Sequence, residues 1–116
     1  MIGSKKMTAA FLMLMITLPT IAMAGGKIWL NFLNDVTVAG TEIKAGTYDV
    51  KWESNDQEAT VSFYTKGKVV AVVKGKIQQV DKKHEYDTFL SVKDNSGRNV
   101  VKEIKLAGKK FSIIFE

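Results

Sequence analysis

The sequence predicts an all-β domain that follows an export signal. Residues 1–24 have the composition of a cleavable signal peptide, and after them apolar and polar residues alternate in short runs that turn-forming residues separate. Because successive side chains of a strand point to opposite faces, such alternation is typical of strands with one face in a core. We expect a single antiparallel β-sandwich or small closed β-barrel of about seven to eight strands.

The signal peptide is indicated by three features within residues 1–24. Lys5 and Lys6 give a positively charged start, residues 9–21 form an apolar segment, and Ala22-Met23-Ala24 is a small-x-small cleavage site. We therefore expect cleavage after Ala24 and a periplasmic or secreted location.

A retained membrane anchor is the alternative to cleavage. The apolar segment is shorter than the roughly 20 residues that cross a bilayer, and it is followed closely by the cleavage site. We expect residues 25–116 to form one domain, because this length suits a single core and no linker or repeat divides it.

Composition excludes several classes of function. The chain has no cysteine, which excludes disulfides, thiol nucleophiles and thiolate metal sites. Its net charge of +5 falls to +3 when Lys5 and Lys6 are removed, and the remaining lysines occur as scattered pairs. Nucleic-acid binding requires such charge on one face, so we expect no nucleic-acid partner.

The first half of the domain gives the clearest strands. We expect strands over residues 27–34 and 36–38, followed by a turn over residues 39–42. Residues 47–53 alternate, which places Tyr48, Val50 and Trp52 in the core. Gly46 precedes this strand and is predicted to be structurally required, at positive φ.

A hairpin is predicted next, with Lys66-Gly67 as its two-residue turn. In this register Phe63 faces Val70, and Val61 faces Val72. The apolar run over residues 69–73 does not select a face by its pattern. Gly75 is interpreted as a bulge or bend that returns Ile77 to the core.

The second half is predicted to contain two further hairpins. Over residues 84–93, the core face would carry Tyr86, Thr88, Leu90 and Val92. Residues 94–98 form a loop rich in turn residues. Val100, Ile104 and Leu106 are then expected in the core, and a turn at Gly108-Lys109 places Ile104 opposite Ile113.

The stretch VAGTEIKAGTYDV, residues 38–50, resembles a recurrent element of small secreted bacterial β-barrel or β-sandwich proteins, of the form v-x-g-t-x-l-p-A-G-x-Y-x-v. Lys44 stands where that element commonly has proline. The resemblance implies a compact antiparallel fold after an export signal. Most such proteins have no assigned activity, and the element brings no catalytic residue.

Candidate chemistry is sparse in this chain. His84 is the only histidine, and it lies among Asp81, Glu85 and Asp87. Glu85 and Asp87 share a strand face that His84 does not, which argues against a metal site. No nucleophile lies beside His84 in the sequence. We interpret His84 as a solvated residue at the start of a strand, and we expect no catalytic residues, metal or cofactor.

Three apolar residues are predicted on outer faces and form a candidate interaction surface: Tyr64, Phe89 and Ile114. We expect an exported, non-enzymatic binding or envelope-structural module with a protein or other envelope partner. Membrane contact is expected only through the signal peptide, and a homo-oligomer is left open. The alternatives are a carrier of a small apolar ligand inside the barrel, a small outer-membrane β-barrel, and an enzyme.

Overall fold

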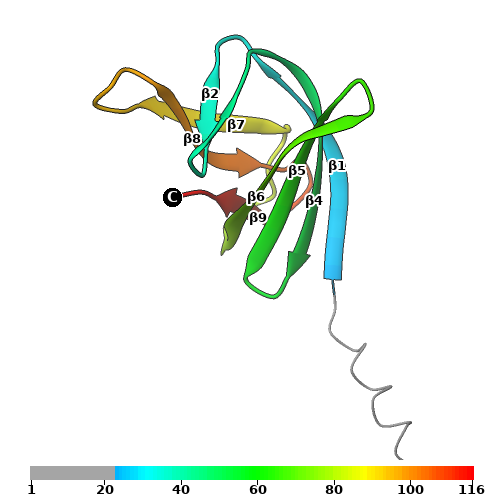
Figure 1. Cartoon of the computed structure of the whole chain (residues 1–116). Helices are drawn as coiled ribbons and strands as arrows, with labels where there is room; N and C mark the ends of the chain where they lie inside the picture. Colours follow the sequence, from blue (N-terminus) through cyan, green and yellow to red (C-terminus); the bar gives the residue numbers. More distant parts are fainter. Residues whose placement is uncertain (1–22) are drawn as a thin grey trace, which may run out of the picture.

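The computed structural model describes residues 23–116, and within this range it has nine strands and no helix (Figure 1). The strands are β1 (Met23–Phe32), β2 (Val36–Val38), β3 (Thr41–Ile43), β4 (Gly46–Asn55), β5 (Glu58–Thr65), β6 (Lys68–Gln79), β7 (Thr88–Lys93), β8 (Asn99–Lys105) and β9 (Phe111–Ile114). The prediction of an all-β fold is confirmed. The predicted signal peptide lies outside the described residues, apart from Met23 and Ala24 at the start of β1.

All nine strands belong to one sheet, in the order β1-β4-β5-β6-β9-β8-β2-β3, with β7 paired to β8. The sheet is not closed into a barrel, so that alternative was wrong, and there is at least one strand more than predicted. The β2–β8 pair is parallel, whereas only antiparallel pairs were expected. The short β2 pairs with residues 99–101 of β8, and β9 pairs with residues 103–105 of the same strand.

The sheet bends over a single core. Figure 1 shows β7 and β8 running across the direction of β1 and β4. Ring contacts join strands that are far apart in the sheet order: the centroids of Phe32 in β1 and Phe89 in β7 are 4.9 Å apart, and those of Trp52 in β4 and Phe111 in β9 are 5.4 Å apart. Two parts of the same sheet therefore pack face to face.

The alternation predicted for β4 is confirmed. Tyr48, Val50 and Trp52 are buried, and the residues between them are exposed or half-buried. The Lys66-Gly67 turn is also confirmed, because Thr65 pairs with Lys68 and both turn residues have positive φ. Two central residues at positive φ define the type I′ turn, whose twist matches that of antiparallel strands.

The predicted register of β5 and β6 is wrong by one residue. Phe63 pairs with Ala71 and Val61 with Val73, because the ladder shifts between Phe63 and Tyr64. Val70 is the extra residue on β6, as in a β-bulge. The small Ala71 thus lies inside, beside a ring that already packs on the rings of Phe32 and Tyr48.

The predicted core face of residues 84–93 is also wrong. β7 begins only at Thr88, Tyr86 is exposed, and Leu90 and Val92 point outward. Phe89 packs against the core instead, edge-on to the ring of Phe32.

A bulge on β8 changes the predicted faces of that strand. Leu90 pairs with Glu103, but the next residue of β7 pairs with Val101, so Lys102 is an extra residue on β8. As a result Val101 and Ile104 are both buried, and Val100, which was expected in the core, is only half-buried. The predicted pairing of Ile104 with Ile113 is confirmed.

Gly75 does not mark a bulge, because β6 continues without a register shift through Gly75, which pairs with Ala59. Ile77 packs against the core, as predicted, on the same face as Val73. The glycine is required for a different reason: a Cβ atom there would lie 2.7 Å from Cγ2 of Ile113. β9 therefore packs directly over this position.

Candidate functional site

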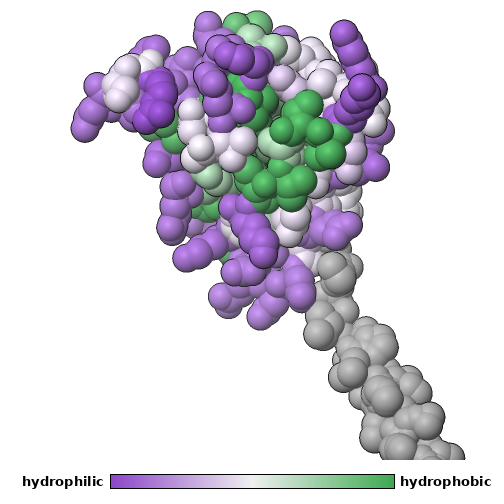
Figure 2. All heavy atoms as spheres, in the orientation of Figure 1, coloured by the Kyte–Doolittle hydropathy of each residue, from purple (hydrophilic) through white to green (hydrophobic). Residues whose placement is uncertain are grey.

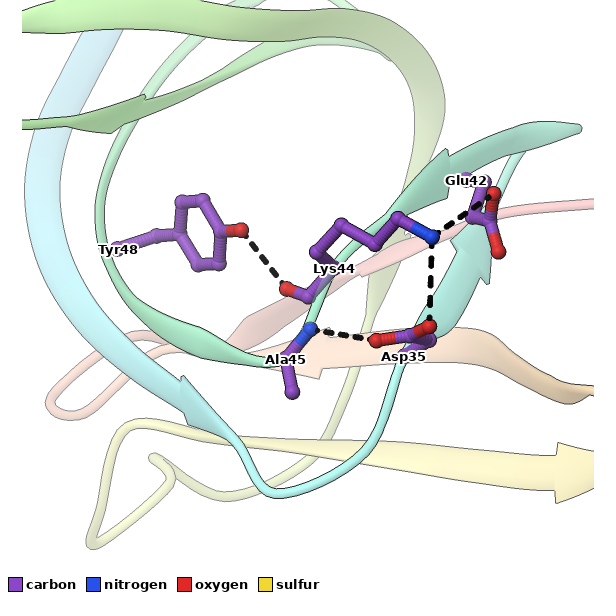
Figure 3. A network of polar contacts seen from close by, with 5 residues as sticks. All are labelled: Asp35, Glu42, Lys44, Ala45 and Tyr48. Atoms are coloured by element: carbon purple, nitrogen blue, oxygen red, sulfur yellow. Dashed lines mark hydrogen bonds and ion pairs between the residues drawn. The ribbon is translucent and has the colours of Figure 1, made fainter.

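Polar contacts hold the turn between β3 and β4 (Figure 3). Gly46 has φ of 147°, which side-chain-bearing residues rarely adopt. The Tyr48 hydroxyl donates to the Lys44 carbonyl at 2.7 Å, and the Ala45 N–H donates to Oδ1 of Asp35 at 2.8 Å. Tyr48 is buried, so these contacts fix how the chain enters β4.

Lys44 takes part in the same network. Its Nζ lies 3.6 Å from Oδ2 of Asp35 and 3.8 Å from Oε1 of Glu42 (Figure 3). Exposed ion pairs of this kind contribute little to stability, typically about 0–1 kcal/mol. The carboxylate of Asp35 is thus engaged by a backbone N–H and an ammonium group, which makes this network structural.

A cleft of about 470 Å³ lies beside this turn, between the β1–β2 connection and the β7–β8 hairpin. Asp35, Glu42 and Arg98 line it, but each is paired with a neighbour. The Arg98 side chain contacts Asp94, whose Oδ1 accepts the backbone N–H groups of Ser96 and Arg98. The N–H of Arg98 is the main cause that lowers the pKa of Asp94, and partial burial opposes it. These groups hold the hairpin loop together.

His84 is not the solvated residue that was predicted. It is half-buried, and its Nε2 lies 2.9 Å from Oγ of Ser112, which is fully buried. Its backbone is tied to the β8–β9 connection, because His84 N–H donates to the Lys109 carbonyl and Gly108 N–H donates to the His84 carbonyl. The segment around His84 therefore covers the outer side of β9 at Ser112.

The His84–Ser112 pair does not form a catalytic arrangement with the nearby acids. Asp87 accepts the backbone N–H of Ala107, and the buried Ser112 hydroxyl lines none of the four clefts described for this structure. Nucleophilic catalysis requires a hydroxyl that a substrate can reach and a base that a third group orients. Among residues 23–116, no group of three or more acidic or histidine side chains is placed to hold a metal ion.

Replacing His84 with alanine should lower the free energy of unfolding by about 1–3 kcal/mol, because the buried Ser112 hydroxyl loses its partner. Chemical denaturation measures this change. The double variant His84→Ala/Ser112→Ala is the control, since it removes both polar groups, and its loss should be smaller than the sum of the single losses. A His84→Ala protein as stable as wild type would contradict the role of this hydrogen bond.

The three predicted surface residues do not come together. Tyr64 lies on the outer face of β5, half-buried, with Nζ of Lys51 4.9 Å from its ring centroid. Ile114 lies on β9, separated from β5 by β6, and lines two adjoining clefts of about 200 and 600 Å³. Phe89 faces the core. Of the three, only Tyr64 adjoins other exposed apolar residues.

Those neighbours are three valines of β6. Val69, Val70 and Val72 have 51%, 49% and 58% of their surface exposed, and Val69 pairs directly with Tyr64. Figure 2 shows an apolar patch in the middle of this face, over β6. We call Tyr64, Val69, Val70 and Val72 the valine surface.

Sequence reasoning did not identify the valines as surface residues, although a signal was present. Residues 69–73 are all apolar, and a strand presents successive side chains to opposite faces. At least two of the five must therefore face outward, and the bulge at Val70 raises this number to three.

Several lysines border the valine surface. Lys66 lies in its hairpin turn and Lys68 follows the turn, Lys74 follows Val72 on the same face, and Lys51 lies over the Tyr64 ring. Across the sheet, Trp29, Asp49, Tyr64 and Val69 form one outer row, and Lys27, Lys51, Ser62 and Val72 form the next. Trp29 is 70% exposed, so an aromatic ring extends this surface to β1.

No protein-family model, curated protein or solved structure matches this chain significantly. Residues 23–116 contain no helix that is long and apolar enough to span a membrane. The fold and its surface define the molecule as a small all-β domain with an exposed apolar surface beside several lysines.

Proposed function

We propose that residues 25–116 form an exported, non-enzymatic binding module of the cell envelope, which contacts its partner through the valine surface. The observation that carries this proposal is the set of exposed valines on β6, beside Tyr64. An exposed cluster of apolar side chains within a polar rim is typical of an interaction site. Each half-exposed valine would contribute about 1 kcal/mol when a partner covers it.

The other classes of function find less support. A carrier needs an empty interior, whereas the rings of Phe32, Tyr48 and Phe63 contact one another inside this domain. An enzyme needs convergent reactive groups in a cleft, whereas Asp35 and Arg98 in the 470 Å³ cleft are engaged by neighbouring groups. The export signal in residues 1–24 supports a periplasmic or secreted location.

Site-specific photocrosslinking in intact cells tests this proposal. A photoreactive amino acid at position 72 should crosslink the exported protein to a partner, either protein or lipid. The same amino acid at position 92 is the matched control, because Val92 is also an exposed strand valine, 44% exposed on β7. Equal labelling from both positions, or none from position 72, would contradict the proposal, as would an exported protein that retains residues before Gly25.

A further inference from the structure

We infer that the valine surface docks on an anionic lipid bilayer, with its valines in the interfacial region and the surrounding lysines at the lipid phosphates. This inference rests on the proposed function and names the partner class. It goes beyond the sequence-based expectation, which placed membrane contact only in the signal peptide. Three observations carry it: the distribution of charge, the position of the aromatic rings and the shape of the surface.

The positive charge of the domain is concentrated at this face. After residue 24 the chain has 15 basic and 12 acidic residues, a net charge of +3. The valine surface, its two outer rows and the next row, in which Thr60 lies between Lys74 and Glu53, carry five lysines: Lys27, Lys51, Lys66, Lys68 and Lys74. With the two acids Asp49 and Glu53 their net charge is +3, which equals the net charge of the whole domain. An anionic surface would therefore attract this face.

The size of this attraction is sufficient for reversible binding. A lysine close to an anionic bilayer raises partitioning by about fivefold. Lysine also has a long apolar stem, which can lie along valine side chains while the ammonium group reaches a phosphate. The lysines therefore need not prevent contact between the valines and the lipid.

The aromatic rings occupy the positions expected at a membrane interface. Trp29 and Tyr64 lie in one row across the outer face of β1, β4 and β5, and the row continues to Val69 on β6. Tryptophan and tyrosine are enriched at membrane–water interfaces, where the ring meets both apolar and polar groups. The Lys51 ammonium group lies above the Tyr64 ring, so an aromatic ring and a positive charge occur at the same point of the surface.

The shape of the surface favours a bilayer over a folded protein partner. Tight protein interfaces are centred on side chains that fill pockets. The four clefts described for this structure have other linings, and none includes Val69, Val70 or Val72. The valines instead project from β6 just after the hairpin tip at Lys66-Gly67, where a flat bilayer can reach them.

Vesicle sedimentation tests the inference with the exported protein. It should bind vesicles in which about a third of the lipid is phosphatidylglycerol, but not vesicles of phosphatidylcholine alone. Binding should weaken as the salt concentration rises, because ions screen the exposed lysines. No binding to the anionic vesicles at low salt, or equal binding to both kinds of vesicle, would overturn the inference.

Matched variants locate the contact. Lys66→Glu/Lys68→Glu should reduce binding at least tenfold, whereas Lys82→Glu/Lys83→Glu, which makes the same charge change in an exposed loop elsewhere, should have a much smaller effect. Val70→Ser/Val72→Ser should also weaken binding, and Leu90→Ser/Val92→Ser on β7 should not. Circular dichroism confirms that each variant is folded. If the two charge variants lose the same amount of vesicle binding, or if the two serine variants do, the assignment to this face is overturned.

The vesicle result is distinguishable from the test of the proposed function. If position 72 crosslinks to a protein in cells and the purified protein does not bind anionic vesicles, the bilayer inference fails and the binding-module proposal stands. If position 72 crosslinks to nothing and no vesicle is bound, both fail.

Discussion

Replacing Trp52 with alanine is expected to lower the free energy of unfolding by about 3–5 kcal/mol. The indole is 3% exposed and packs edge-on against the Phe111 ring of β9, with Nζ of Lys109 6.0 Å from its centroid. It also fills the space beneath Gly26, where a Cβ atom would lie 2.9 Å from its Nε1. Truncation would leave a cavity bordered by β1, β4 and β9, which the surrounding strands can close only in part.

Trp29→Ala is the matched control for this measurement. Trp29 is 70% exposed on β1, so its truncation should change stability by no more than about 0.5 kcal/mol. Urea denaturation followed by circular dichroism reports both variants. If the Trp52→Ala protein is as stable as Trp29→Ala but no longer binds vesicles, Trp52 belongs to the binding surface and not to the core.

The features that were predicted correctly follow from local rules. The alternation of Tyr48, Val50 and Trp52 specifies the buried face of β4, because a strand has a period of two residues. Lys66-Gly67 specifies a two-residue turn, because glycine adopts positive φ without a steric cost. Each of these features depends on residues that are close together in the sequence.

The features that were predicted wrongly depend on single extra residues. The bulge at Val70 moves the inward set from Val70 and Val72 to Ala71 and Val73, and the bulge at Lys102 replaces Val100 by Val101 in the core. Shifting a strand by one residue exchanges its two faces. Val70 lies within a run of apolar residues, and Val100 and Val101, which precede Lys102, are both apolar, so the hydrophobic pattern does not locate either bulge.

The candidate site was predicted only at Tyr64. The prediction placed Tyr64 on an outer face, where the structure has it, but Phe89 faces the core and Ile114 lies beyond β6. The valine surface depends on a bulge, and the concentration of positive charge depends on the order of β1, β4, β5 and β6 in the sheet. Neither the bulge nor the strand order is determined by spacing along the chain.

Gly75→Val is expected to destabilise the domain by about 3 kcal/mol or more, the upper end of the usual cost of overpacking. A Cβ atom at this position would lie 2.7 Å from Cγ2 of Ile113, 2.9 Å from the carbonyl oxygen of Ile114 and 3.0 Å from Cε1 of Phe115. The Ile113 and Phe115 side chains are buried, and the Ile114 carbonyl belongs to the backbone, so none of the three groups can move away easily.

The comparison that identifies the cause is with Lys74→Val, which places the same side chain one residue earlier, where β6 faces solvent. That variant should stay within about 0.5 kcal/mol of wild type. Gly75→Ala should fall between the two, at about 1–3 kcal/mol. Its cost should be smaller, but not zero, when it is measured relative to Ile113→Ala, because the Ile114 carbonyl remains in place. Thermal unfolding measures these variants, Ile113→Ala and the double variant. If Gly75→Val has the same melting temperature as Lys74→Val, β9 does not pack over β6 at this point. The glycine would then have only the role of a bend, which its sequence context suggested.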